Sequence, residues 1–133
     1  MEEKLLAEDL AVPALVRLAD DEDEDNRDWA TFALGSFTHS SSEDVLEVLW
    51  RRLTDDNPEV RGEALVGLAR RGVTDIVPII EEELQYDDVG TLQVEAALEL
   101  GDPALNGVLV ELDRRGWDKK PELLADAIRR TSP

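Results

Sequence analysis

The stretch DDNPEVRGEALVGLARRG, residues 55–72, decides the fold expected of this chain. Its apolar side chains recur every three or four residues, which is the period of one face of an α-helix: Val60, Ala64, Leu65 and Leu68. Asn57 before Pro58 is typical of a helix start, because the amide side chain caps free backbone N–H groups and proline fits the first turn. Gly72 is typical of a helix end. The stretch therefore predicts a helix over residues 58–71.

The same pattern occurs twice more along the chain. Residues 21–36, DEDEDNRDWATFALGS, align at an offset of 34, and residues 87–102, DDVGTLQVEAALELGD, align at an offset of 32 with Gln93 in place of arginine. Another apolar helical pattern precedes each copy, and a fourth follows the last: residues 10–20, 44–55, 74–88 and 103–116. Repeats of this length indicate a chain built from stacked supersecondary units.

These segments predict an all-α protein with a single domain over residues 1–133. The expected helical hairpins cover residues of about 10–38, 43–72, 74–101 and 103–131. Ser42 and Thr74 are expected to cap helix starts, and Trp117 is expected to cover the end of the core. The last helix, residues 121–130, is expected to close the stack with Leu123, Leu124, Ala127 and Ile128 facing inward. No segment shows the apolar–polar alternation of a strand.

The pattern D-x-x-x-x-V-R-x-x-A-x-x-x-L, best seen from Asp55 to Leu68, resembles the HEAT repeat. More narrowly, the chain is similar to the bacterial HEAT-like class once named for phycobiliprotein lyases, over residues of about 10–116. The resemblance implies a right-handed α-α superhelix, a solenoid of about three and a half hairpins with a C-terminal capping helix. It also implies a structural ladder between neighbouring repeats, formed by Asp21, Arg27, Asp55 and Arg61.

The chain is strongly acidic, with 32 Asp and Glu against 14 Lys and Arg and a formal net charge of −18. Nucleic acids and anionic membranes need a basic surface, so we expect neither as a partner. The acidity would speed encounter with a basic protein, and it would equally serve solubility or adaptation of the organism to salt. The run of acids at residues 20–25 is expected to be a solvated loop before a helix.

Catalytic chemistry has little support in the sequence. There is no cysteine and one histidine, His39, which excludes thiolate sites and the usual His-rich metal sites. No phosphate-binding loop or hydrolase motif occurs. We therefore expect no enzyme, no cofactor and no metal. No apolar run is long enough for a membrane span and the first residues are acidic, so we expect a cytoplasmic location.

Helical register assigns candidate binding residues to the second helix of each hairpin. The expected groove residues turn away from the predicted core: Trp29, Phe32, Glu63, Val66, Arg70 and Glu95. Trp29 beside carboxylates could hold a cationic side chain, or it could pack against a neighbouring repeat; the sequence leaves both open. Trp50 is expected to pack in the core or between repeats.

In proteins of this class the concave face holds proteins or peptides. We therefore expect a non-catalytic scaffold or adaptor, monomeric, that binds a protein or peptide partner, a basic one by its charge. One alternative is an immunity or antitoxin protein that neutralises a basic bacterial toxin. The other is a lyase-type enzyme of the HEAT-like class.

Overall fold

The computed structural model describes the backbone of residues 2–133 and the side chains of residues 11–133. This part of the chain is helical and contains no strand, which confirms the all-α prediction. The elements pair in chain order, with two short 3-10 turns leading into α5 and α7: α1 (Glu2–Ala19), α2 (Glu24–Phe37), α3 (Glu43–Arg52), α4 (Pro58–Arg70), η1 (Thr74–Ile76), α5 (Val77–Glu83), α6 (Thr91–Leu100), η2 (Pro103–Leu105), α7 (Asn106–Arg114) and α8 (Pro121–Thr131).

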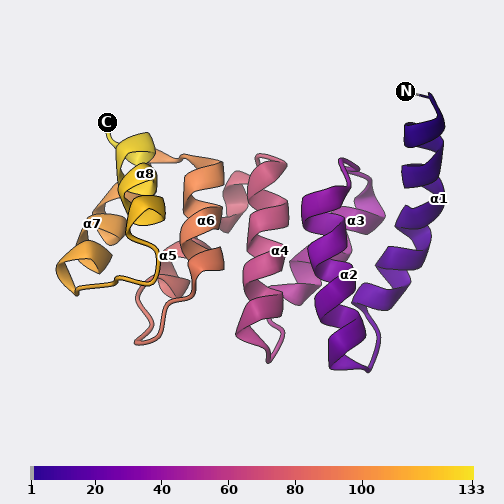
Figure 1. Ribbon diagram of the computed structural model, residues 1–133, viewed down its shortest axis with the longest axis horizontal. Helices are drawn as coiled ribbons and strands as arrows, with labels where there is room; N and C mark the ends of the chain where they lie inside the picture. Colours follow the sequence, from indigo (N-terminus) through magenta and orange to yellow (C-terminus); the bar gives the residue numbers. More distant parts are fainter. Residues whose placement is uncertain (1) are drawn as a thin grey trace.

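The second helices of the four pairs lie side by side in one row (Figure 1). We call α2, α4, α6 and α8 the front layer, since each packs against the next. Helices α3, α5 and α7 lie behind it, and α1 packs against both α2 and α3 at one end. The two termini therefore lie at opposite ends of the long axis (Figure 1).

Local sequence explains where most helices begin and end. Asp23, Ser42 and Asn57 each accept backbone N–H groups at the starts of α2, α3 and α4. Gly101 ends α6 with φ 66°, a left-handed conformation that a side chain would disfavour. Thr74 was expected to cap a helix, but it is the first residue of η1 and its side chain caps nothing there. The predicted first hairpin also begins too late, because α1 starts at Glu2.

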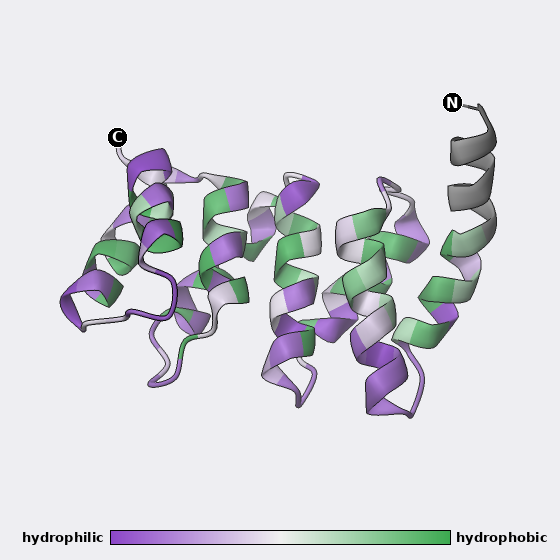
Figure 2. Cartoon of the chain, in the orientation of Figure 1, coloured by the Kyte–Doolittle hydropathy of each residue, from purple (hydrophilic) through white to green (hydrophobic). Residues whose placement is uncertain are grey.

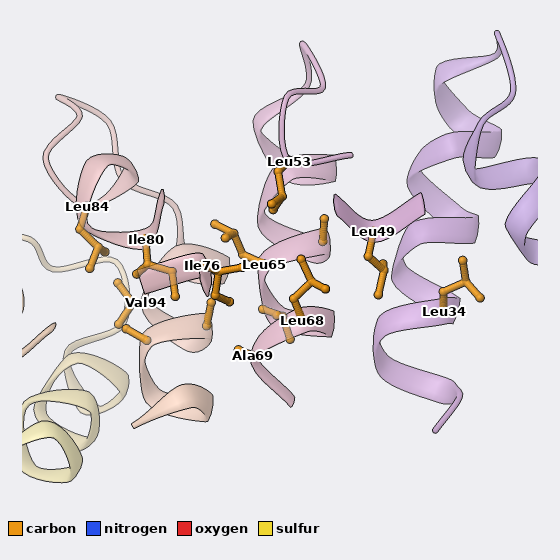
Figure 3. Packing of buried hydrophobic residues seen from close by; sticks show 14 of the residues in the cluster. Leu34, Leu49, Leu53, Leu65, Leu68, Ala69, Ile76, Ile80, Leu84 and Val94 are labelled. Atoms are coloured by element: carbon orange, nitrogen blue, oxygen red, sulfur yellow. The ribbon is translucent and has the colours of Figure 1, made fainter. Parts of the chain in front are cut away.

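The core is aliphatic. The largest fully buried side chains are all leucine, isoleucine or valine. Figure 3 shows them continuing from Leu34 of α2 through Leu65 and Leu68 of α4 to Ile80 and Leu84. Strongly hydrophilic residues gather instead around the start of α2, where the acidic run lies (Figure 2). Each pair of helices thus buries its apolar side against its neighbours in one continuous core.

An arginine in α2 joins the first two hairpins. The Arg27 Nε donates to Asp55 Oδ2 over 2.9 Å, and its Nη1 donates to the carbonyl oxygens of Asp21 and Glu22 over 3.1 and 2.9 Å. Asp55 is nearly inaccessible, with a side chain 2% exposed, and it also pairs with Arg52. Burial alone would raise the pKa of Asp55, but the Asn57 N–H and the Arg27 guanidinium hold it below its usual range.

The same arrangement recurs one hairpin later with different residues. Arg61 Nη1 donates to the Asp55 carbonyl oxygen over 2.9 Å, while its Nε lies 3.4 Å from Glu83 Oε1. Gln93 replaces the arginine of the third copy, and its amide donates to Glu83 and to the Pro58 carbonyl oxygen over 3.3 Å each. Glu83 of α5 therefore takes the place in the third hairpin that Asp55 holds in the second.

Helices α2 and α4 approach until their backbones touch. A Cβ added to Gly67 would lie 2.8 Å from the Cα of Gly35 and 3.3 Å from Leu49 Cδ1. A Cβ atom essentially never comes that close to a non-bonded backbone carbon, so a larger residue at position 67 would force the two helices to shift. This close approach fixes the spacing of the front layer at its N-terminal half.

Replacing Asp55 with alanine should destabilise the protein by about 3 kcal/mol, because Arg27 and Arg52 would lose a buried counter-charge. Since the pKa of Asp55 is depressed in the folded state, its contribution is present above the unfolded-state value and is lost as the pH falls through the folded-state value. Chemical denaturation at neutral and acidic pH measures both effects. Asp20→Ala, which removes the exposed partner of Arg51, is the control and should cost less than about 1 kcal/mol. Equal losses in the two variants would contradict the role of Asp55.

Gly67→Ala should lower the free energy of unfolding by about 1–3 kcal/mol, because the new methyl group must push α2 away from α4. Gly107→Ala in α7 is the matched control, since no atom lies within 4 Å of the added Cβ. There alanine should be neutral or stabilise the helix by up to about 1 kcal/mol. Thermal unfolding of both variants tests the contact, and a harmless Gly67→Ala would refute it.

Candidate functional site on the outer face of α2, α4 and α6

The candidate site lies on the side of the front layer that faces away from the core. The structure exposes Trp29 and Phe32 of α2, and it leaves Glu63 and Glu95 half-buried. Together with Arg70 these residues, all expected from helical register, define what we call the α2–α4–α6 face. They come from three helices that pack directly against one another.

Val66 does not belong to this face, although helical register had assigned it there. Its side chain is 2% exposed and forms part of the core. The reason is that α4 has α2 on one flank and α6 on the other, so most of its circumference is covered. Only a narrow strip of α4 reaches solvent, and on this face that strip includes Glu63 and Arg70.

Helix α2 presents an aromatic cluster to solvent. Trp29 is 59% exposed and Phe37 is 69% exposed, so more than half of each side chain faces solvent. Phe32 is also exposed, and its ring meets that of Phe37 edge-to-face at 5.1 Å between centroids. Phe37 was not among the predicted site residues. The sequence could have indicated it, because Ala30, Ala33 and Leu34 already fill the buried side of this helix.

Trp50 was expected to pack in the core or between repeats, and it lies outside the buried core. Its side chain is 44% exposed. In α3 the buried positions are Val45, Val48 and Leu49, so Trp50 lies at the edge of the apolar stripe. The indole therefore stands at the surface of the layer behind the α2–α4–α6 face.

Two carboxyl groups meet between α2 and α4. Burial and a hydrogen bond with Asp28 raise the pKa of Glu63 to about 9, and the charge of Glu59 adds to the shift. The Oε2 atom of Glu63 is buried and has no hydrogen-bond partner. At neutral pH Glu63 is therefore protonated and hydrogen-bonded to Asp28.

Arg70 links all three helices of the face. Its Nη2 lies 3.7 Å from Glu95 Oε1, its Nε lies 3.7 Å from Glu99 Oε1, and its Nη1 donates to the Ser36 carbonyl oxygen over 3.4 Å. These groups are more than a third exposed, so the ion pairs are weak. Arg70 thus balances the acids of α6, whereas the Asp28–Glu63 pair has no basic partner among the contacts described here.

The described residues offer no group of three or more His, Asp or Glu side chains arranged to hold a metal ion. None of the helices of residues 2–133 has the length and apolar character that a bilayer crossing requires. The α2–α4–α6 face combines exposed aromatic rings with acidic side chains.

The fold defines an all-helical protein built from successive antiparallel helix pairs. No protein-family model matches the sequence. The chain is similar to Protein YibA of Escherichia coli K12, with 37% identity over 102 residues that make up 74% of this chain and 35% of YibA. The protein of the same name from Escherichia coli O157:H7 matches equally. The chain thus spans about a third of the length of the curated relatives it matches.

The crystal structure of Escherichia coli YibA has a similar fold. It superposes with a TM-score of 0.78 and 32% identity, covering 90% of this chain and 43% of that one. Nearly all of the helix arrangement described above therefore has a counterpart within YibA.

Glu63→Gln should raise the melting temperature above that of the unchanged protein at pH 8, and the difference should shrink toward pH 5. The pKa of Glu63 is raised in the folded state, so ionisation costs stability as the pH rises from the unfolded-state value toward about 9. Glutamine removes that cost. Glu59→Gln removes one charge from the same helix and is the control for general charge repulsion. Equal changes of melting temperature in the two variants would contradict the raised pKa of Glu63.

Proposed function

We propose that this chain is a HEAT-like solenoid, a right-handed superhelix of stacked helical hairpins within one domain. Three observations support it. The helix pairs follow one another at the repeat interval of the sequence, each second helix packs against the next, and Arg27 and Arg61 make related contacts to the following hairpin. In such proteins neighbouring repeats share one core and leave an extended face for binding.

We further propose that the protein is a non-catalytic scaffold that binds a partner protein on the α2–α4–α6 face. The observation that carries this proposal is the distribution of aromatic side chains. The chain has three tryptophans, two phenylalanines and one tyrosine, and all except Trp117 are exposed, while the core is aliphatic. Exposed aromatic rings cost free energy in water, and they are the residues that protein interfaces favour. Trp29, Phe32 and Phe37 form the largest such cluster, on a single helix.

The charges on this face select a basic partner. Trp29 directly follows Asp28, whose carboxyl group is hydrogen-bonded to Glu63. A lysine or arginine of the partner would stack on the indole and approach these two acids. The overall charge of −18 would steer such a partner toward the surface. Because a nearby cation favours the ionised carboxylate, binding at this point would release the proton held by Glu63.

The Asp28–Glu63 pair also bears on the two alternative functions. A carboxyl group with a raised pKa is a common feature of catalytic acids, and this favours the lyase-type alternative. Against it, Glu63 is only half-buried on an open helix face. Neutralisation of a basic toxin is a narrower form of the scaffold proposal, which the same acidic face would serve.

Affinity capture of partners from a native lysate, at low and at high salt, tests the proposal. Trp29→Ala/Phe32→Ala should weaken capture of the partner by about tenfold or more, because it removes the aromatic anchors. Tyr86→Ala removes an equally exposed aromatic from the loop after α5 and should leave capture unchanged. A partner that resists high salt, or that is lost equally in both variants, would contradict a basic ligand on the α2–α4–α6 face.

A further inference from the structure

A second apolar surface lies on α3, in the layer behind the α2–α4–α6 face. A groove of about 590 Å³ separates α3 from the end of α4 and the start of η1. Leu46 and Trp50, one helical turn apart, form one wall, and Leu68 and Val73 lie opposite. Trp50 is 44% exposed here, so a large indole borders an open, mostly apolar space.

The rim of this groove is acidic on its α3 side. Glu43 and Glu47 line it, also one turn apart on α3, and both are exposed. Arg51 lies on the rim as well, but its guanidinium is engaged by Asp20, with Nη2 2.5 Å from Oδ2 and Nε 3.3 Å from Oδ1. An acidic row thus runs beside the apolar row of Leu46 and Trp50.

We propose that this groove, the Trp50 groove, binds an amphipathic helix whose apolar ridge is flanked by lysine or arginine. The apolar ridge fills the space between Trp50 and Val73, and the basic flank pairs with Glu43 and Glu47. The occupant is a helix because the groove walls are side chains of helices with satisfied backbones, so an incoming segment must satisfy its own backbone hydrogen bonds.

The charge balance disfavours a second copy of this chain as the natural occupant. Two chains that each carry −18 repel one another, and Arg51, the basic residue of the rim, is already engaged by Asp20. A basic segment is attracted by both the net charge and the rim. The groove also uses none of the exposed residues of the α2–α4–α6 face, so both surfaces can be occupied together and the protein can bridge two partners.

The test uses a fluorescently labelled synthetic helix of leucine and lysine, with leucines at positions i, i+3, i+4 and i+7. Its dissociation constant is measured by anisotropy, and its site is mapped by backbone amide shifts of the unchanged protein. Trp50→Ser should weaken binding about tenfold or more, and Glu43→Gln/Glu47→Gln should weaken it several-fold. Amide shifts should centre on Leu46, Glu47, Trp50 and Val73.

Two variants serve as matched controls. Tyr86→Ala removes a similarly exposed aromatic ring from the loop after α5, and Asp87→Asn/Glu122→Gln removes two exposed acids elsewhere; both should change the affinity less than about twofold. The proposal is overturned if the peptide does not bind, if amide shifts map to α2, α4 and α6, or if Trp29→Ala, rather than Trp50→Ser, weakens binding. Equal affinity for a peptide with glutamine in place of lysine would also overturn it.

Discussion

The buried carboxylate of Asp55 is the contact on which the stacking of this chain most depends. It lies between two hairpins. It accepts one hydrogen bond from Arg27 of the first hairpin and another from the backbone N–H of Asn57 in the second. A carboxylate with a side chain only 2% exposed is tolerated because these partners replace its water. Asp55 lies just before the start of α4 and holds Arg27 of α2 at the same time. The one carboxylate therefore fixes both the turn into α4 and the position of α4 beside α2.

The stacking of the hairpins determines which side chains of the front layer reach solvent. Packing α4 between α2 and α6 removes Val66 from solvent and brings Glu63 against Asp28. It also leaves the aromatic side of α2 without a neighbour. The α2–α4–α6 face is therefore a consequence of the packing of the front layer. The acids of α6 on this face are paired with Arg70, whereas Glu63 is protonated and hydrogen-bonded to Asp28.

Aromatic side chains divide the molecule into a structural interior and surfaces open to recognition. The interior uses leucine, isoleucine, valine and alanine, which interlock without polar atoms. Trp117 alone has a structural role among the tryptophans, since its Nε1 donates to the Val89 carbonyl oxygen over 2.7 Å while its ring packs on the core. Trp29 and Trp50 are exposed instead, and they mark two surfaces on opposite layers.

The sequence by itself determined the helices, most of their caps and the apolar stripe of each, because these depend on residues within one or two turns. It also placed Trp29, Phe32 and Glu63 on one side of their helices. Only the tertiary structure decided which positions are covered. Val66 is buried and Trp50 is exposed because of neighbours far away in sequence, and helical register carries no information about them. The raised pKa of Glu63 has the same origin, since Asp28 and the burial come from packing between two hairpins.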